Sequence, residues 1–376
     1  MIKIAVMGGG LVGTPMALDL NKDDKIHVKL ADINAGNLKR AQSKGVECVE
    51  MNLLEDGKLE EFISDADFVI NALPGLVGYQ SLKRAVMAGK SGVDIAFYPE
   101  DFSELQEIAI EKGVCWVVDM GVAPGMSHLL SAYATTQFEE TFDIKIYVGG
   151  LPKSTDSYWQ YKAPFSPSDV IEEYTRPARF VKNGEEVTMP ALSENEILEF
   201  PVIGELEAFN SDGLRSLIKS LKVDNMIEKT LRYPGYVDKI TVLKESGLLS
   251  PDEELIKGTK IKPIDFTSHL LFNQWKLGEE DVDITVMQVK AKGTLNGEEK
   301  TIVYDLYDEY CPSTRIHSMA RTTGYAATSV LGIMMDGMFN HPGVHPPEML
   351  AFHKEIVLDV LERLKKRGVL YRKTTQ

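Results

Sequence analysis

The chain has 376 residues, of which 44% are hydrophobic, so it is long enough to bury a core and to form more than one domain. Its formal net charge of −15 comes without a basic face, which excludes a duplex-nucleic-acid binder. The three cysteines lie far apart, which argues against a disulfide framework and against zinc. No apolar stretch approaches the ~20 residues of a membrane helix, and the apolar N-terminal run is too short for a signal peptide. We therefore expect a cytoplasmic protein that binds neither nucleic acid nor membrane nor metal.

Apolar runs and helical patterns alternate through the first 124 residues. Strands are predicted at 2–7, 26–31, 46–51, 67–73, 91–97 and 114–119, and helices at 34–44, 76–89 and 102–112. A further helix is predicted after Gly13, where Met16, Ala17 and Leu20 recur at helical spacing. This alternation predicts a parallel sheet with helices on both faces and right-handed crossovers.

The regular alternation of predicted strands and helices ends after residue 125. A helix is predicted over 125–138, strands at 143–149, 282–292 and 299–307, and two final helices over 320–338 and 353–367. Asn183-Gly184 and Asn296-Gly297 each separate apolar runs, as tight hairpin turns do. The β-branched, alternating runs are typical of antiparallel strands.

The predicted fold class is α/β, with a Rossmann-type, doubly wound parallel sheet and an inserted α+β domain for substrate binding and dimerisation. The predicted boundaries are 1–124 for the dinucleotide-binding domain, 125–318 for the inserted domain, and 319–376 for helices that return to the first domain.

A glycine-rich segment, GGGLVG, follows the first strand directly and opens the first helix. It places Gly8, Gly10 and Gly13 in the Gly-x-Gly-x-x-Gly register of dinucleotide-binding sites. Gly8 permits the tight turn, Gly10 leaves room for the pyrophosphate, and Gly13 lets helix and strand pack closely. The backbone amides around Leu11 and Val12, at the start of the helix, are then expected to meet the phosphates.

Asp32 ends the second strand, in the position from which a carboxylate accepts the ribose hydroxyls of adenosine and repels a 2′-phosphate. Ile33 and Asn34 follow it and carry no positive charge, whereas an NADP site usually offers an arginine there. Arg40 lies further along the predicted helix, where we expect it to face solvent. The predicted cofactor is therefore NAD, with Ile33 beside Asp32 in the adenosine site.

Asn71, Ala72, Leu73 and Pro74 end the fourth strand, across the topological switch point from the first. Ligands of open α/β sheets lie at the carboxyl ends of such strands. Backbone groups of this segment are therefore expected to face the nicotinamide ribose. Asp94 ends the fifth strand on the same edge, where it is a candidate for cofactor contact and catalysis or, equally, for capping the next turn.

Several sequence segments, here called phrases, resemble those of a known family. They are DMGVAPGMSHLL (119–130), IYVGGLP (146–152), EEYTRPARFVKNG (172–184), LEAFNSDGLRSL (206–217) and TLRYPGY (230–236). Together they resemble the saccharopine dehydrogenase family, over most of the chain, in order and with compatible spacings. Within that family, the compact size and the phrases ALPG, EYTRPAR and DGLRS are most similar to the L-lysine 6-dehydrogenases, archaeal members included.

The resemblance implies NAD-dependent oxidation of the ε-amine of L-lysine, with release of ammonia. The product would be a semialdehyde, allysine, that cyclises to Δ1-piperideine-6-carboxylate. His128 departs from that pattern, because lysine 6-dehydrogenases tend to have Asn there, and a His resembles the saccharopine-cleaving branch. Saccharopine dehydrogenase and a related amino acid dehydrogenase therefore remain alternatives.

Dehydrogenation of an amine needs a base, because an ammonium has no lone pair to assist the departure of hydride. Water that attacks the resulting iminium needs a base as well. The candidates at the nicotinamide edge are Asp94, Glu100 and His128, of which His128 can act near neutral pH. His128 is equally well explained as a helix histidine packed between domains.

The other end of an amino acid substrate is a carboxylate, which arginine binds bidentately. Arg215 and Arg232 lie in two of the resembling phrases and are the candidate anchors, with a surface salt bridge as the alternative for each. Asp212 is the candidate for receiving the α-ammonium. Arg176 and Arg179 are candidates for bracing the inserted domain instead.

The implied partners are a small amino acid, L-lysine or a saccharopine-like molecule, and further copies of the chain in a homodimer or higher homo-oligomer. A second class of function stays open, a non-catalytic NAD(H)-binding protein whose middle domain mediates dimerisation or partner contact. Replacement of Arg215 and Arg232 separates the two classes, because an enzyme would lose turnover and keep its affinity for NAD.

Overall fold

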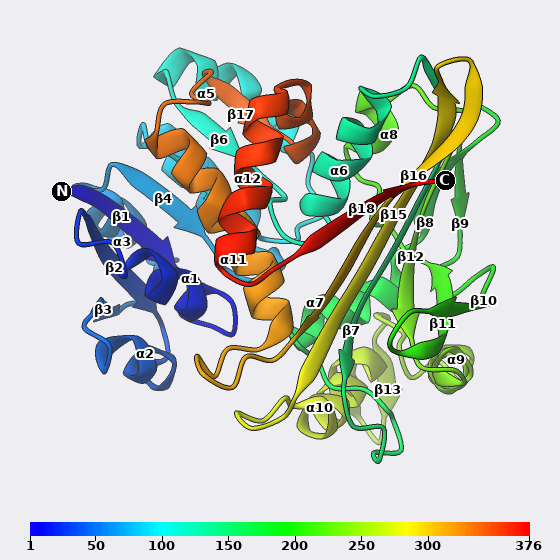
Figure 1. Cartoon of the computed structure of the whole chain (residues 1–376). Helices are drawn as coiled ribbons and strands as arrows, with labels where there is room; N and C mark the ends of the chain where they lie inside the picture. The colour runs from blue at the N-terminus through cyan, green and yellow to red at the C-terminus, as the bar shows by residue number, and fades with distance from the viewer. The chain divides into compact units, whose positions relative to one another are not determined.

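The computed structural model describes residues 1–166 and 169–376 in full, and only the backbone at positions 167 and 168. The chain forms two compact units (Figure 1). The first unit comprises residues 1–136 and 319–371, and the second comprises residues 137–318 and 372–376. Among the described residues, no helix combines the length and the apolar character that a membrane span requires.

The first unit contains a seven-stranded sheet in the order β17-β6-β5-β4-β1-β2-β3. Every adjacent pair of strands is parallel. The strands are β1 (Ile2–Met7), β2 (Ile26–Asp32), β3 (Glu47–Glu50), β4 (Phe68–Asn71), β5 (Ser91–Asp94), β6 (Cys115–Val117) and β17 (Gly343–His345). The predicted doubly wound parallel sheet is confirmed. Strand β17 was not predicted, because three residues between proline-containing segments are too short to show a period.

Helices connect these strands and pack on the sheet. They are α1 (Gly13–Leu20), α2 (Ala35–Gln42), α3 (Lys58–Ile63), α4 (Gly75–Met87), α5 (Gln106–Lys112), α6 (Met126–Thr135), α11 (Ser318–Met335) and α12 (Lys354–Lys366), with the 3-10 helices η1 (Phe102–Leu105) and η2 (Pro347–Phe352). The buried Asp19 of α1 accepts hydrogen bonds from Thr328 Oγ1 of α11, at 2.8 Å, and from Arg367 Nε just after α12, at 2.7 Å. This polar contact attaches the C-terminal helices to α1.

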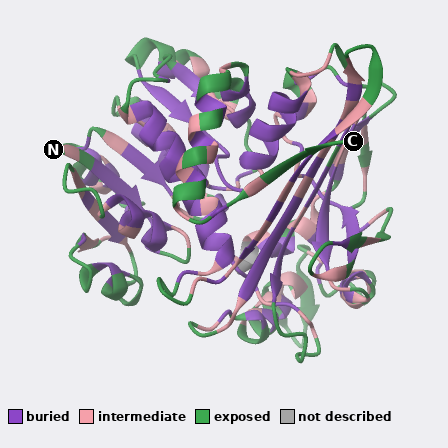
Figure 2. Cartoon of the chain, in the orientation of Figure 1, coloured by how far each residue is buried: buried purple, intermediate pink, exposed green. Residues whose placement is uncertain are grey.

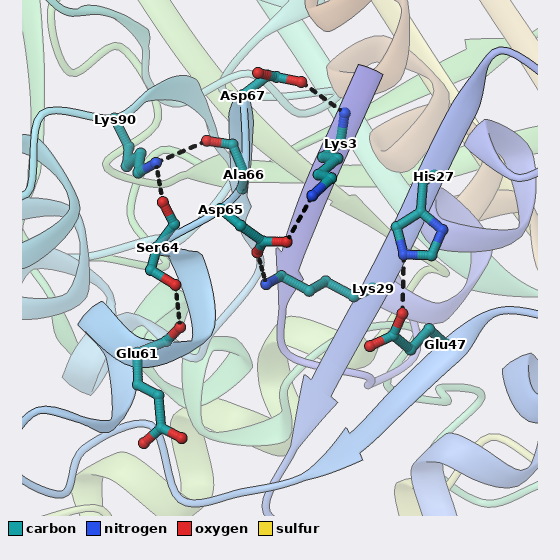
Figure 3. Close-up of polar contacts among 10 residues, drawn as sticks. All are labelled: Lys3, His27, Lys29, Glu47, Glu61, Ser64, Asp65, Ala66, Asp67 and Lys90. Carbon is teal, nitrogen blue, oxygen red and sulfur yellow. Dashed lines mark hydrogen bonds and ion pairs between the residues drawn. The ribbon is translucent and has the colours of Figure 1, made fainter. Parts of the chain in front are cut away.

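Ion pairs secure the amino-terminal edge of the parallel sheet (Figure 3). Asp65 accepts hydrogen bonds from Lys3 Nζ and Lys29 Nζ, and the backbone N–H of Lys3 donates to Asp67. Lys90 Nζ donates to the carbonyls of Ser64, at 2.7 Å, and Ala66, at 2.8 Å. These contacts fix the turn that leads into β4.

The second unit contains a nine-stranded mixed sheet in the order β10-β11-β12-β7-β15-β16-β18, with β8 paired to β12 and β9 paired to β8. Its strands are β7 (Glu140–Pro152), β8 (Ala178–Lys182), β9 (Glu185–Met189), β10 (Glu196–Phe200), β11 (Gly204–Asn210), β12 (Asn225–Arg232), β15 (Asp283–Leu295), β16 (Glu298–Glu309) and β18 (Tyr371–Thr375). The long strands β7, β15 and β16 run side by side (Figure 1) and are largely buried (Figure 2).

The remaining elements of this unit are helices and a small hairpin. They are α7 (Pro167–Thr175), α8 (Leu217–Ser220), α9 (Tyr236–Glu245), α10 (Pro263–Trp275) and a separate hairpin of β13 (Glu254–Ile256) and β14 (Thr259–Ile261). Residues of α7, α9 and α10 form an aromatic core that includes Tyr174, Tyr236 and Trp275.

Both predicted hairpin turns are confirmed. Asn183 and Gly184 have φ of 54° and 78° and connect β8 to β9, while Asn296 and Gly297 have φ of 54° and 74° and connect β15 to β16. Positive φ at both central residues gives the turn whose twist matches that of paired strands, and Asn-Gly tolerates this conformation best.

Candidate functional site

The glycine-rich loop between β1 and α1 leaves no space for side chains at two of its glycines. A Cβ on Gly8, whose φ is 101°, would lie 2.6 Å from the carbonyl oxygen of Ala72. A Cβ on Gly13 would lie 1.8 Å from the carbonyl oxygen of Gly8. At Gly10, by contrast, a Cβ would meet no atom within 4 Å. The loop is therefore tightly packed against β4 and the start of α1, and open at Gly10, as a dinucleotide cradle requires.

Asp32 lies at the carboxyl end of β2 and is tied to this loop. Its Oδ2 accepts a hydrogen bond from Gly9 N at 2.8 Å, and its Oδ1 accepts bonds from Asn34 N at 2.7 Å and from Asn37 Nδ2 at 3.2 Å. Leu11, in the glycine-rich loop, and Ile33, which follows Asp32, remain 45% and 66% exposed. A carboxylate flanked by exposed apolar side chains suits the ribose and the adenine of a dinucleotide.

The carboxyl ends of β4 and β5 are joined by side chains. Asn71 and Asp94 are opposite each other in the sheet and are both fully buried. Asn71 Nδ2 donates to Asp94 Oδ2 at 3.0 Å and to the carbonyl of Gly78 at 2.9 Å, while Asp94 Oδ1 accepts from Ala96 N at 2.6 Å. Both oxygens of Asp94 thus accept hydrogen bonds from the protein.

The rest of the predicted cofactor segment is more open. Val12 is half-buried at the N-terminus of α1, Ala72 and Leu73 are half-buried after β4, and Pro74 is exposed at the start of α4. These residues are therefore accessible at this edge of the sheet, and their contact with the nicotinamide ribose stays a prediction.

The other two base candidates lie in different environments of the first unit. Glu100 is exposed in the segment between β5 and η1. His128 is fully buried in the first turn of α6, where its Nδ1 is 3.0 Å from Ser127 Oγ. All three base candidates therefore belong to the first unit, and the three substrate candidates belong to the second.

Arg232, at the end of β12, is buried inside the second unit. Its Nη2 donates to Glu173 Oε2 at 2.6 Å, and its guanidinium lies 4.6 Å from the ring centroid of Tyr161 and 5.7 Å from that of Tyr236. Burial raises the pKa of the Glu173 carboxyl, and the Arg232 charge opposes that shift. The guanidinium is thus already matched with a carboxylate and with aromatic faces, as in a buried brace.

Asp212 is also paired within the protein. Its Oδ1 and Oδ2 accept hydrogen bonds from Arg179 Nε and Nη2, both at 2.9 Å, in a bidentate arrangement. Arg179 thereby braces the domain, the alternative considered for it from the sequence. Arg215 lies three residues further on, is half-buried, and has a φ of 44°.

The sequence reasoning missed Glu228 and Glu173. Glu228 is 5% exposed, and its Oε2 accepts a hydrogen bond from Ser211 Oγ at 2.6 Å. A signal was available for Glu228, because Glu228, Thr230 and Arg232 alternate along one strand and so share a face. Three polar residues on one face of a buried strand indicate a polar cluster.

The first unit is thus a nicotinamide-dinucleotide-binding domain, with its cradle at the carboxyl edge of a parallel sheet. Two family models match the chain, the saccharopine dehydrogenase NADP binding domain over residues 4–117 and the saccharopine dehydrogenase C-terminal domain over residues 121–369. The chain belongs to the saccharopine dehydrogenase family, as its sequence phrases predicted.

Relatives of known name are distant. The chain is 22% identical to mitochondrial alpha-aminoadipic semialdehyde synthase of Mus musculus, over 98% of the chain and 47% of the relative. It is 22% identical to saccharopine dehydrogenase [NADP(+), L-glutamate-forming] of Saccharomyces cerevisiae, over 98% of each. It is 25% identical to carboxyaminopropylagmatine dehydrogenase of a Synechocystis species, over 93% of the chain and 95% of the relative.

The chain therefore spans about half the length of its mammalian relatives and nearly all of the yeast one. The solved structure of apo saccharopine dehydrogenase (L-Glu forming) from Saccharomyces cerevisiae superposes with a TM-score of 0.84 over 100% of both chains, at 19% identity. This likeness establishes the shared fold.

Proposed function

We propose that the chain is an NAD-dependent amino acid dehydrogenase that oxidises the ε-amine of L-lysine to allysine and releases ammonia. The observation that carries the proposal is the presence, in one chain, of a complete dinucleotide cradle and the C-terminal domain of the saccharopine dehydrogenase family. The phrases ALPG, EYTRPAR and DGLRS support lysine as the substrate, because they are most similar to those of lysine 6-dehydrogenases.

Saccharopine is the second candidate substrate, favoured by His128 and by the name of the yeast relative. The two reactions share their chemistry. Both remove hydride from carbon 6, which carries the nitrogen, and water then replaces that nitrogen to give the same semialdehyde. Ammonia leaves when the substrate is lysine, and glutamate leaves when it is saccharopine.

The adenosine end of the cradle supports NAD as the cofactor. The Asp32 carboxylate lies where it would repel a 2′-phosphate, and residues 33–38 contain neither lysine nor arginine. Several relatives carry NADP(+) in their names, so this proposal departs from them. Bound NAD would supply the hydride acceptor, while the loop from Gly8 to Gly13 would hold its pyrophosphate.

The proton must be taken by a side chain near the substrate nitrogen. Asp94 is fully buried and both of its oxygens accept protein hydrogen bonds, so we assign it to positioning the ends of β4 and β5. His128 and Glu100 then remain as candidate bases. Substitution His128→Asn, which introduces the residue typical of lysine 6-dehydrogenases, and Glu100→Gln separate them, because loss of the base removes the alkaline rise of kcat.

Arg215 is the proposed anchor for the substrate carboxylate. Arg232 is placed second because its charge is already matched by Glu173. Asp212 is assigned to holding the loop through Arg179 rather than to the α-ammonium, since both its oxygens accept from that arginine. A left-handed backbone at a residue other than glycine is a recurrent feature of ligand-binding positions, and Arg215 has one.

A substrate panel tests the proposal. The purified chain is incubated with lysine, saccharopine, ornithine or diaminopimelate, each with NAD and with NADP, and reduced cofactor, ammonia and glutamate are measured. Lysine with NAD should give NADH and ammonia in equal amounts. Glutamate from saccharopine, without activity on lysine, would establish the second candidate. If no amino acid yields reduced cofactor, the result would favour an NAD(H)-binding protein without catalytic activity.

The cofactor assignment has its own variant. Asp32→Ala should weaken NAD by about tenfold or more relative to NADP, because charged hydrogen bonds to the ribose are lost and the repulsion of phosphate disappears. Asp24→Ala, at an exposed position of the same domain, is the matched control. Unchanged selectivity in Asp32→Ala would overturn the assignment of NAD.

A further inference from the structure

The segment Ser211–Arg215, here called the anchor loop, follows β11 and carries the proposed carboxylate anchor. Arg215 has a φ of 44°, in the left-handed region. A side chain with a Cβ adopts this conformation at a cost of about 1–2 kcal/mol. Such a conformation persists only where surrounding contacts determine it.

Each of the three residues Ser211, Asp212 and Gly213 is fixed to a neighbouring strand. Asp212 is held by Arg179 of β8 through two side-chain hydrogen bonds of 2.9 Å. Ser211 Oγ lies 2.6 Å from Glu228 Oε2 and 2.7 Å from Thr230 Oγ1, both of β12. The contacts precede Arg215 directly, so they determine where its backbone turns.

Gly213 rests on the Glu228 side chain. A Cβ at position 213 would lie 2.3 Å from Glu228 Cδ, and the backbone N–H of Gly213 donates to the Glu228 carboxyl. Glu228 is therefore in contact with the anchor loop through two of its residues. A larger residue at 213 would therefore require either the Glu228 carboxyl or the loop to move.

The burial of an ionised Glu228 carboxyl is energetically unfavourable. Burial raises its pKa to about 8, the neighbouring Glu173 and Asp212 carboxylates act in the same direction, and the bonds from Ser211 and Gly213 oppose them. A buried carboxyl is unfavourable unless it is hydrogen-bonded. The bonds that offset its burial come from the anchor loop, so the carboxyl and the loop stabilise each other.

We propose that Glu228 is a positioning residue that holds the anchor loop, and so Arg215, in the conformation that binds the substrate carboxylate. The inference rests on the role proposed for Arg215. Arg179 acts on the same loop through Asp212. Its guanidinium is close enough to Arg215 for the two positive charges to repel each other. The anchor loop is thus fixed by an acid on one side and a base on the other.

The shape of the contact predicts which variants work. Glu228→Gln can rebuild the network, because the amide oxygen accepts from Gly213 N–H while the amide nitrogen donates to Ser211 Oγ, which then donates to Thr230. Glu228→Ala removes every contact. We expect Glu228→Ala to raise KM for the amino acid about ten- to a hundredfold, with a smaller change in kcat, and Glu228→Gln to restore KM to near the wild-type value.

A double-mutant cycle separates positioning from general stabilisation. KM for lysine and for NAD is measured for wild type, Glu228→Ala, Arg215→Ala and the double variant, with Glu199→Ala, at an exposed strand position, as the control. If Glu228 acts through Arg215, the double variant is no worse than Arg215→Ala. Independent, additive losses, or an equal rise of KM for NAD, would overturn the inference. Should Glu228→Ala not fold, Ser211→Ala removes the same contact from the loop side and enters the same cycle.

Failure of this inference and failure of the proposed function give different results. A wild-type chain that oxidises no amino acid refutes the proposed function, and the inference with it. A wild-type chain that oxidises lysine or saccharopine, with KM unmoved in Glu228→Ala and in Ser211→Ala, refutes the inference alone.

Discussion

The cofactor cradle and the anchor loop are built on opposite principles. The cradle, Gly8 to Gly13, consists of backbone and of space that side chains would fill, and its glycines lie close together in the sequence. The anchor loop depends on charged side chains from other strands, with Arg179 and Asp212 separated by 33 residues and Ser211 and Glu228 by 17. A site made of backbone can be recognised from a local motif, whereas a site made of paired charges requires knowledge of which strands are neighbours.

The largest effect is expected at Arg232, whose charge is paired with Glu173 in the same unit as the anchor loop. Arg232→Ala leaves the largely buried Glu173 without its cation and should destabilise the protein by about 3–5 kcal/mol. The double variant Arg232→Met with Glu173→Gln should recover most of that loss, because no unpaired charge remains. Urea unfolding measures both. A loss below about 1 kcal/mol would show that the pair is hydrated and not a brace.

In the cofactor cradle, we expect replacements of two glycines to have different effects. Gly13→Ala should cost about 3 kcal/mol and abolish dinucleotide binding, because its Cβ would lie 1.8 Å from a backbone oxygen. Gly10→Ala should leave unfolding unchanged, since its Cβ meets no atom within 4 Å, yet weaken NAD binding where the pyrophosphate approaches. Thermal unfolding and calorimetric titration with NADH separate the two. Equal stability of both variants would contradict the packing described for the loop.

The same contrast explains what the sequence predicted. The glycines of the cradle and both Asn-Gly hairpins were accessible because each is a local sequence motif, and Asp32 was accessible because it ends the strand that follows the glycine-rich loop and its helix. Strand β17 was not, because it is a strand only through its pairing with β6. Asp212 was assigned to a substrate ammonium because its partner, Arg179, is brought to it only when β8 and β11 join the same sheet.

Glu228 gives an intermediate effect with a distinct pH dependence. Its pKa in the folded protein is raised to about 8, so its contribution to stability is present in acid and is lost as the pH rises through that value. The Glu228→Gln side chain does not ionise, so its burial carries no cost that grows with pH. The variant should match wild type near pH 4 and exceed it by roughly 1–3 kcal/mol at pH 9. Urea unfolding across this range, with Glu199→Gln as the control, tests it, and a difference independent of pH would contradict it.

The smallest effect is expected at the amino-terminal edge of the Rossmann sheet, where Asp65 pairs with Lys3 and Lys29 (Figure 3). Hydrogen bonds from Lys29 and Lys3 lower the pKa of Asp65 to about 2. This carboxylate therefore contributes stability above its unfolded pKa, and the contribution is lost as the pH falls toward 2. Its side chain is 51% exposed, so solvent screens the pairs, and Asp65→Asn should cost less than about 1 kcal/mol at pH 7. The cost should shrink as the pH falls toward 2, because the wild-type carboxyl then becomes protonated as well. A loss comparable to that of Arg232→Ala would mean that burial is not what separates strong from weak charge pairs in this protein.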